Sequence, residues 1–424
     1  MINITDKHNC CGCSACASIC PKQCISMVAD NEGFLYPQVN KETCIDCGLC
    51  EKACNELHPY KKQKPLKVLA AINKKEEIRI KSSSGGIFFI LAEKIINEGG
   101  AVFGARFDNN WQVVIDYAED MEGIEAFMGS KYVQARIENA YKDVKRILAE
   151  GRKVLFSGTP CQVAGLHQFL RKPYENLVTI DFICHGTPSP KVWDMYLNEV
   201  ISCCKQVKKT NFRRKWGHLN FSIEYNENTK ITSLQSPAHE NHYMRAFLSD
   251  LILRPSCSSC AAKSCSSQSD ITLADFWGVW NEIPNMNDNK GTSILLVKTQ
   301  KGIALLPKKE LVEYADSNYE TTIKYNKACV ASIPPNPKRE VFFNQLQNCS
   351  SVTHLIDKVL QPPLIKRYIK TFKLLVTKFL NRSSIGHRYN SSRYINPSIY
   401  SISFRNKSLG WKKYQLEITI IDNQ

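Results

Sequence analysis

The chain has 424 residues, of which 43% are hydrophobic and 23% charged, and its formal net charge is +16. This length excludes a protein that is a ferredoxin alone, and the usual domain size of about 100 to 200 residues predicts two or three domains. No apolar run reaches the roughly 18 residues of a membrane-spanning helix, and residues 1–6 lack the basic and then apolar pattern of a signal peptide. We therefore expect a globular protein without a membrane span or a secretory leader.

A cysteine motif occurs twice in the first 54 residues. Each copy reads C-x2-C-x2-C-x3-C, which is the spacing of bacterial two-cluster ferredoxins. Three thiolates on one tight loop bind three irons of a cubane cluster, whereas the fourth thiolate points away and binds the other cluster. We assign one [4Fe-4S] cluster to Cys10, Cys13, Cys16 and Cys54, and the second to Cys20, Cys44, Cys47 and Cys50.

Zinc and disulfides are the alternative uses of these cysteines. Zinc usually takes its ligands as two separated pairs, and disulfide frameworks suit short secreted chains, so neither fits the repeat. Cys11 and Cys24 fall outside the pattern and are interpreted as bystanders, although Cys11 is close enough to Cys10 to replace it in a misassembled site. Cysteines used as cluster ligands require a reducing compartment, which predicts the cytoplasm.

The positive charge by itself is compatible with a nucleic-acid partner. However, each [4Fe-4S] site with four thiolates carries a charge of about −2 when oxidised, so metal loading removes much of the excess. We therefore expect no nucleic-acid partner. Retention of the metal-loaded protein on DNA at low salt would contradict this expectation.

Residues 1–60 form the expected ferredoxin domain, whose core is too small to be stable without metal. A basic linker, Lys61–Pro65, follows, and then a strand over 68–72, a turn over 82–86, a helix over 87–96 and a strand over 101–107. A strand, a glycine-rich turn and a helix can present backbone N–H groups to a phosphate. Serine and glycine also serve as helix cap and turn residues, so both interpretations stay open. The chain has neither a G-x-G-x-x-G fingerprint nor a P-loop.

Further cysteines follow predicted strands. A strand over 153–156 leads to Cys161 at the start of a helix, where the helix dipole favours a thiolate, and a strand over 177–183 leads to Cys184. Cys257 and Cys260 come before a strand-like segment over 270–278. Open α/β sheets place their sites at the C-terminal ends of strands. These four cysteines are enough for a third cluster, but isolated cysteines are also common small core residues, so the residues alone leave both interpretations open.

Taken together, the motifs resemble those of the beta subunits of the deazaflavin-coenzyme (F420) reducing hydrogenases and of related formate dehydrogenases. The resemblance covers residues 1–335. It rests on the ferredoxin repeat and on the segments 83–86 (SSGG), 129–134 (GSKYVQ), 157–166 (SGTPCQVAGL), 184–186 (CHG), 257–260 (CSSC) and 269–275 (SDITLAD). It implies a small two-cluster ferredoxin domain followed by a mixed α/β iron-sulfur flavoprotein domain, so the expected fold class is α+β or α/β.

The resemblance also implies cofactors and the residues that hold them. It implies FAD and a core [4Fe-4S] cluster held by Cys161, Cys184, Cys257 and Cys260, with Cys265 as a reserve ligand. The residues that it assigns to FAD are Ser83, Ser84, Gly85, Gly86, Ser130, Lys131, Tyr132, Gln134, Gly158 and Thr159. His185 and Asp275 lie beside these segments, and a structural role is as open for them as orienting a ligand or donating a proton. No catalytic residue is assigned.

We expect a ferredoxin domain over 1–60, the two parts of one α/β domain over 67–150 and 151–335, and a helical, basic extension over 336–424. In the extension, a basic amphipathic pattern over 365–380 predicts a helix docked on its own domain, with peripheral membrane contact as the alternative. The basic and aromatic segment 212–218 fits either a clamp for a flat anion or a solvated loop. The tail from residue 382 is not assigned.

Two functions follow from these expectations. The first is a flavin-dependent oxidoreductase that takes electrons from a donor such as ferredoxin or a partner subunit and passes a hydride to a small-molecule or glycan-linked acceptor. The second is a non-catalytic electron-transfer subunit of a larger oxidoreductase. A reductase of surface-polysaccharide biosynthesis is a variant of the first function, because the residues alone do not identify the acceptor.

Overall fold

The structure, a computed structural model, describes residues 1–201, 206–216, 218–227, 230–361, 401–405 and 415–419. They fall into two compact units, Met1–Gln361 and Pro362–Gln424. In the second unit, β14 (Ser401–Arg405) pairs antiparallel with β15 (Gln415–Thr419). The elements described below all belong to the first unit. Among the described residues, no helix is long and apolar enough to cross a membrane.

The N-terminal segment has the expected ferredoxin-like fold. Its elements are η1 (Lys7–Asn9), α1 (Ala15–Ile19), β1 (Ile25–Ala29), β2 (Leu35–Val39) and α2 (Leu49–Lys52). Each cysteine loop enters its short helix through a residue with left-handed backbone, Ser14 at φ 60° and Gly48 at φ 69°. β1 and β2 form an antiparallel hairpin with Ile25 opposite Val39. The two halves of the cysteine repeat therefore share one local geometry.

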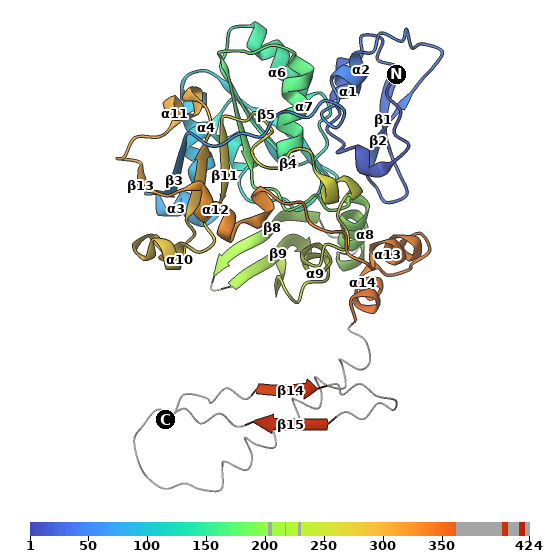
Figure 1. Cartoon of the computed structure of the whole chain (residues 1–424), viewed down its shortest axis with the longest axis vertical. Coiled ribbons are helices and arrows are strands. Elements are labelled where there is room, and N and C mark those ends of the chain that lie inside the picture. The colour runs from blue at the N-terminus through green and yellow to red at the C-terminus, as the bar shows by residue number, and fades with distance from the viewer. Residues whose placement is uncertain (202–205, 217, 228–229, 362–400, 406–414, 420–424) are drawn as a thin grey trace. The chain divides into compact units, whose positions relative to one another are not determined.

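A mixed eight-stranded sheet forms the centre of the molecule (Figure 1). Its order is β13-β3-β12-β11-β7-β6-β4-β5, in which β4, β6, β7 and β11 run parallel and the outer pairs are antiparallel. The strands are β3 (Lys67–Asn73), β4 (Ala101–Phe107), β5 (Val113–Ala118), β6 (Val154–Ser157), β7 (Leu177–Phe182), β11 (Ile271–Asp275), β12 (Ser293–Val297) and β13 (Val312–Asp316). One sheet thus combines strands from both expected parts of the α/β domain, 67–150 and 151–335.

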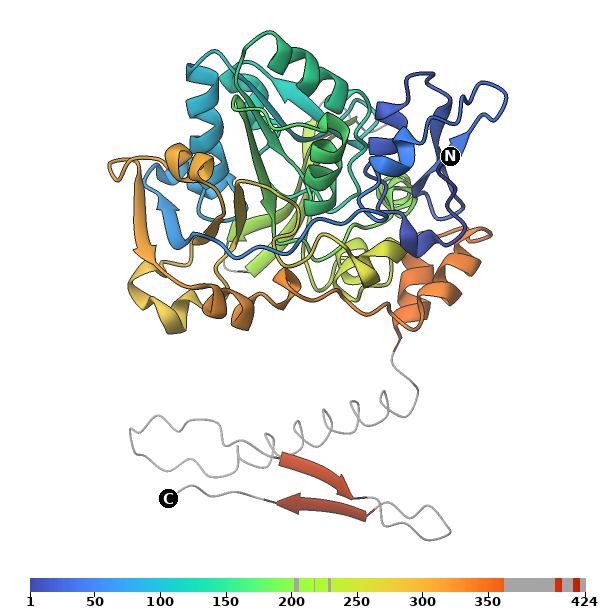
Figure 2. The same cartoon turned by 45° about the horizontal axis from the view of Figure 1, so that its top comes forward.

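Helices cover both faces of this sheet, as Figures 1 and 2 show. Successive residues of a strand point to opposite faces. Leu155 of β6 accordingly packs in the cluster that contains Leu91 of α4 (Ile87–Asn97), and Phe156 packs in the cluster that contains Val163 of α7 (Pro160–Leu170). The remaining helices around the sheet are α3 (Glu76–Lys81), α5 (Met121–Glu125), α6 (Ala140–Ala149), α10 (Val279–Glu282), α11 (Gln300–Leu305) and α12 (Tyr319–Tyr325), with the 3-10 turns η2 (Pro255–Ser259), η3 (Pro284–Met286) and η4 (Lys327–Cys329).

A second, three-stranded antiparallel sheet packs with helices around an aromatic core. It contains β8 (Gln206–Trp216), β9 (His218–Glu227) and β10 (Lys230–Pro237). Of the two interpretations of the segment 212–218, the solvated loop is wrong, since residues 212–216 lie in β8 and residue 218 begins β9. Phe212 is 1% exposed, and its ring lies 5.2 Å from that of Trp193. The Phe212 side chain therefore serves the core.

The helices that pack with this sheet are α8 (Pro190–Val200), α9 (His242–Leu248), α13 (Arg339–Leu346) and α14 (Val352–Leu360). Helices α13 and α14 belong to the expected helical extension and contribute Phe342 and Ile356 to the same buried cluster. The amphipathic pattern over 365–380 and most of the tail lie outside the described residues. Peripheral membrane contact therefore stays a prediction from the sequence pattern.

Candidate cluster and flavin sites

The second cysteine loop lines a pocket together with a residue of the first loop. Cys44, Cys47, Cys50 and Cys20 all border this pocket. It thus brings together the four residues that the spacing assigns to the second cluster, including the crossed ligand Cys20. Cys24 lies at its edge, with its sulfur 3.3 Å from that of Cys20.

The residues assigned to the first cluster lie on the side of the ferredoxin segment that faces the α/β sheet. Cys13 is 9% exposed and packs in the same apolar cluster as Val163 of α7. Burial raises the pKa of Cys16 to about 12, and the nearby thiols of Cys10 and Cys54 add to the shift. Thiols held in this way become thiolates when a metal supplies the compensating positive charge. The donor set fits a cluster, and cluster ligation by these residues stays a prediction.

A third group of cysteines lines one pocket at the ends of two parallel strands. Cys161 lies in the first turn of α7 after β6, Cys184 follows β7, and Cys257 lies in the turn η2, which Cys260 follows. The N–H of Thr187 donates to the Cys257 sulfur at 3.4 Å. The four sequence-predicted core residues are thus brought together from three distant segments.

The electrostatics of this pocket resemble those of the first site. Burial raises the pKa of Cys260 to about 12, and burial together with the Cys257 thiol raises the pKa of Cys184. Arg254 and Lys263 border the pocket but supply fewer positive charges than four thiolates carry, so four thiolates there need a polynuclear cation. Among the described residues, no three His, Cys, Asp or Glu side chains are grouped closely enough to hold a single metal ion. A cubane differs from such an ion because each cysteine binds a separate iron at its own corner.

Cys11 connects the first site to the third. Its thiol contacts those of Cys13 and Cys161, and it borders the core pocket. The bystander interpretation of Cys11 therefore does not describe its position. The contact joins residues 150 positions apart, and no local spacing signals it.

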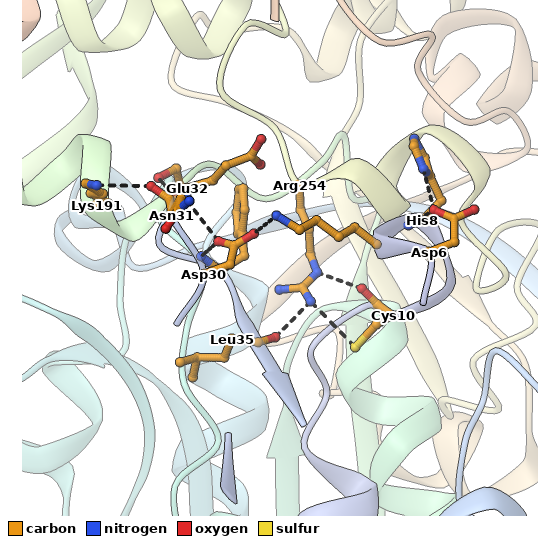
Figure 3. Close-up of polar contacts among 12 residues, drawn as sticks. Asp6, His8, Cys10, Asp30, Asn31, Glu32, Leu35, Lys191 and Arg254 are labelled. Atoms are coloured by element: carbon orange, nitrogen blue, oxygen red, sulfur yellow. Dashed lines mark hydrogen bonds and ion pairs between the residues drawn. The ribbon is translucent and has the colours of Figure 1, made fainter. Parts of the chain in front are cut away.

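Arg254 borders the core pocket, and Figure 3 shows its side chain bonded to Cys10 and Leu35 of the ferredoxin segment. The residue is 2% exposed. Its guanidinium donates to the carbonyl of Cys10 at 2.7 Å, to the carbonyl of Leu35 at 2.9 Å and to the Cys10 sulfur at 3.6 Å. It also donates to Gln134 Oε1 at 3.1 Å and lies 4.4 Å from the centre of the Tyr36 ring. One buried cation thereby holds a predicted cluster ligand next to the loop that carries Cys257.

The two main segments assigned to FAD meet at their serines. The hydroxyls of Ser83 and Ser130 are 2.8 Å apart, although 47 residues separate them. Gly86 is the N-cap residue of α4, has φ +79° and provides no side-chain cap. The first N–H groups of α4 therefore remain available to an acceptor. Gly85 has a packing role, because a Cβ there would lie 2.4 Å from the carbonyl oxygen of Ala71.

Next to Ser130 lies a group of aromatic and charged side chains. The ring of Tyr132 stacks on Phe247 at 4.5 Å. Arg213 donates to Asp275 at 2.5 Å, and its guanidinium lies 5.8 Å from the Trp277 ring. Despite desolvation, Asp275 raises the pKa of Arg213 and keeps it charged. This group offers a cation and ring faces to a flat, anionic ligand.

Other residues assigned to FAD point elsewhere. The side-chain amide of Gln134 donates to the Cys11 carbonyl at 3.2 Å, and the hydroxyl of Thr159 lies 3.1 Å from the Cys161 sulfur. Burial lowers the pKa of Lys131, and its amine donates to the carbonyls of residues 126 and 128 at 2.7 and 2.9 Å. Gly158 donates its N–H to a carbonyl of β7. Ser84 donates its hydroxyl to the carbonyl of residue 292 at 3.0 Å.

His185 connects the core pocket with the aromatic group. It borders the pocket, and its Nε2 lies 2.5 Å from the Asp250 carboxylate. Its ring meets Phe247 edge-on at 5.7 Å, and Phe247 stacks on Tyr132 on its other side. The cysteine pocket and the segment assigned to the flavin are therefore separated by few side chains.

Comparisons with known proteins show which families the sequence resembles. Residues 151–319 match the family model for the C terminus of the coenzyme F420 hydrogenase/dehydrogenase beta subunit, and residues 9–56 match that of the 4Fe-4S dicluster domain. The chain is 23% identical over 342 residues to an uncharacterized protein of Methanocaldococcus jannaschii, covering 70% of this chain and 86% of that protein. A solved chain of the F420-reducing NiFe hydrogenase complex from Methanosarcina barkeri is 18% identical, with a TM-score of 0.44, covering 67% of this chain and 93% of that chain. The two family matches confirm the resemblance expected from the motifs.

Proposed function

Because the chain joins a 4Fe-4S dicluster domain to a C-terminal domain of the coenzyme F420 hydrogenase/dehydrogenase beta-subunit family, we propose that it is an iron-sulfur flavoprotein oxidoreductase. It passes electrons from two ferredoxin-type clusters and a core cluster, with the help of FAD, to a hydride-accepting cofactor or organic substrate. The donor is a ferredoxin or a partner oxidoreductase subunit. A chain that depends on thiolate ligands works in a reducing compartment, which favours the cytoplasm.

The observation that carries this proposal is the serial arrangement of three cysteine sites. Cys20 links the second loop to the first, and Cys11 contacts both Cys13 of the first loop and Cys161 of the core pocket. A continuous series of thiol sites, each buried or half-buried, suits stepwise electron transfer better than three independent structural metal sites. No observation favours a glycan as the hydride acceptor, so the hypothesis of a reductase in surface-polysaccharide biosynthesis gains no support.

The chain's own residues would hold each group. The cysteines supply thiolates, and Arg254 orients the Cys10 loop by bonds to two carbonyls. For FAD, the candidates are the paired hydroxyls of Ser83 and Ser130 and the uncapped start of α4. FAD, when bound, supplies the exchange between single electrons and a hydride. The Phe247 and His185 rings pack edge to face between the two sites.

Anaerobic purification followed by iron, sulfide and flavin analysis tests the proposal. Three cubanes predict about twelve irons and one FAD per chain. Replacing a core ligand, in C184S, is expected to remove about four irons and leave the ferredoxin clusters in place. C349S is the matched control, because Cys349 lies outside both cysteine pockets and should change nothing. Eight irons without flavin in the wild-type protein would contradict the proposal.

A second measurement separates an enzyme from a relay subunit. The purified holoprotein is supplied with reduced ferredoxin and a panel of hydride acceptors, without any partner protein. Turnover of an acceptor supports the enzyme, whereas reduction of the clusters and the flavin without turnover supports the non-catalytic role.

A further inference from the structure

Two further cysteines form a pair in the wall of the core pocket. Cys265 and Cys329 are 7% and 6% exposed, and both border the pocket that Cys161, Cys184 and Cys260 also line. They belong to one buried cluster of side chains between η4 and β12. Both are free thiols in this structure.

The backbone holds these two cysteines against each other. The N–H of Ser264 donates to the carbonyl of Cys329 at 2.8 Å, and the amine of Lys263 donates to the carbonyls of Ala328 at 2.8 Å and Cys184 at 2.6 Å. The two thiols and the Tyr319 hydroxyl lie close enough to interact electrostatically. The pair is therefore positioned by bonds that do not depend on either sulfur.

The local backbone is strained at this point. Ser264 and Cys265 have φ angles of 59° and 58°, in the left-handed region that residues other than glycine rarely adopt. Backbone strain of this kind concentrates at functional sites. A different backbone would turn the Cys265 side chain away from its present neighbours.

A buried ion pair lies beside the two thiols. The Lys298 side chain is fully buried, and its amine lies 3.7 Å from the carboxylate of Asp181, which borders the pocket. The charges of Lys298 and Asp181 both act on the Cys265 thiol.

The pair is distinct from the four predicted cluster ligands. Electrostatic contacts connect Cys161, Cys184, Cys257 and Cys260 with one another, whereas Cys265 and Cys329 contact each other and Tyr319. The pocket is therefore lined by two groups of thiols: the four predicted ligands together with Cys11, and the pair Cys265 and Cys329.

We propose that Cys265 and Cys329 form a redox-active dithiol that exchanges electrons with the core cluster. On oxidation, the two S–H bonds break, one S–S bond forms, and two protons and two electrons leave. The electrons pass one at a time to oxidised iron-sulfur centres, and reduction reverses each of these changes. The source and destination of the electrons rest on the proposed function, whereas the dithiol itself is made of the chain's own residues.

The test poises the anaerobic holoprotein at a series of potentials, with dithionite and thionine as reductant and oxidant. Each sample is unfolded in iodoacetamide, and its peptides are analysed by mass spectrometry. We expect alkylation of both cysteines at low potential, and at high potential a linked peptide that lacks two hydrogen atoms. The ratio of dithiol to disulfide should change tenfold per about 30 mV, the slope of a two-electron couple, whereas a one-electron couple requires about 59 mV.

Variants distinguish the dithiol from reserve cluster ligands. C265S and C329S should each leave one thiol that is alkylated at every potential, with the iron content of the wild-type protein. C349S should leave the couple unchanged. Full alkylation of both cysteines at all potentials overturns the proposal, and so does a loss of about four irons in either variant, because that would make the residue a ligand. Iron and flavin contents of the same samples report separately on the proposed function.

Discussion

Arg254 brings a buried positive charge to a predicted cluster ligand. Its guanidinium donates to the Cys10 sulfur at 3.6 Å. Hydrogen bonds and positive charge at cluster sulfurs favour the more negative, reduced state and so raise the reduction potential. A difference of about 1 kcal/mol between the two oxidation states corresponds to about 40 mV for one electron. We expect R254Q to lower the midpoint potential of the first cluster by this amount in a redox titration followed by electron paramagnetic resonance.

The control for this variant is another arginine of the same unit. Arg245 donates to Asp357 at 2.6 Å, away from the cysteines, and R245Q should leave all midpoint potentials unchanged. Iron content must be measured for both variants, because loss of the cluster would also remove its signal. A fully iron-loaded R254Q protein with the wild-type potential would show that the charge does not act on the cluster.

The residues differ in how far the sequence alone could predict them. Spacing identified the eight cysteines of the ferredoxin repeat because a cubane takes three of its ligands from one short loop. The roles of Cys11 and Arg254 could not be predicted, because their partners lie far away along the chain and only the fold brings them together. Gln134 is the converse case, since a motif assigned it to FAD while the fold turns its amide to Cys11 and Arg254.

Helix α7 carries the contact between the ferredoxin segment and the sheet. Gly165 lies on the face of α7 where Cys13 packs, and a Cβ there would lie 2.9 Å from the Cys13 sulfur and from the Tyr141 hydroxyl. Overpacking of a well-packed interior costs about 1–3 kcal/mol. We expect G165A to displace the Cys13 loop, lower the melting temperature and reduce the iron content by up to about four atoms per chain.

A second glycine separates general destabilisation from cluster loss. Gly302 of α11 is equally crowded, since a Cβ there would lie 2.7 Å from the carbonyl oxygen of Asp270, but it lies away from the cysteines. G302A should lower the melting temperature to a similar extent and retain all of its iron. Equal iron contents in the two variants would show that α7 does not position the cluster loop.

At the level of elements, prediction succeeded where burial makes a strand continuously apolar. The expected strands over 68–72, 101–107, 153–156 and 177–183 match β3, β4, β6 and β7 to within one residue at each end. β8 was missed because its sequence, QVKKTNFRRKW, is dominated by basic residues. Its place in a sheet depends on pairing with the next strand, β9, and the effect of a pairing partner leaves little trace in the sequence of a single strand.

The ferredoxin segment contacts the rest of its unit through the β1–β2 hairpin as well as through its cysteine loops. The tip of the β1–β2 hairpin reaches α8 and α13 (Figures 2 and 3). Ser189 donates its hydroxyl to the Glu32 carbonyl at 2.5 Å, and Lys191 donates its amine to the Asn31 carbonyl at 3.0 Å. Arg339 binds the Glu32 carboxylate, with both side chains 15% exposed. The distance between the first and third cysteine sites is therefore set by contacts on both sides of Arg254.

The Glu32–Arg339 ion pair allows this docking to be tested without touching a cysteine. E32Q keeps the shape of the side chain but leaves the Arg339 charge unpaired. Removing one partner of a buried ion pair lowers the free energy of unfolding by about 3–5 kcal/mol, whereas removing one partner of an exposed pair lowers it by less than about 1 kcal/mol. Because this pair is partly buried, we expect E32Q to cost about 1–3 kcal/mol. Because about 1.4 kcal/mol is a factor of ten in an equilibrium constant, amide hydrogen exchange in the β1–β2 hairpin should accelerate about tenfold or more.

A matched variant on the same hairpin shows whether burial of the pair matters. Lys7 donates to Asp30 at 2.6 Å, and its side chain is 49% exposed. K7Q therefore removes a solvent-screened pair and should accelerate exchange of the hairpin by less than about fivefold. If both variants exchange at the wild-type rate with full iron content, the clusters alone hold the segment in place. If only E32Q accelerates, the hairpin contacts contribute to the spacing between the cysteine sites, and electron transfer from the ferredoxin clusters should slow in the same variant.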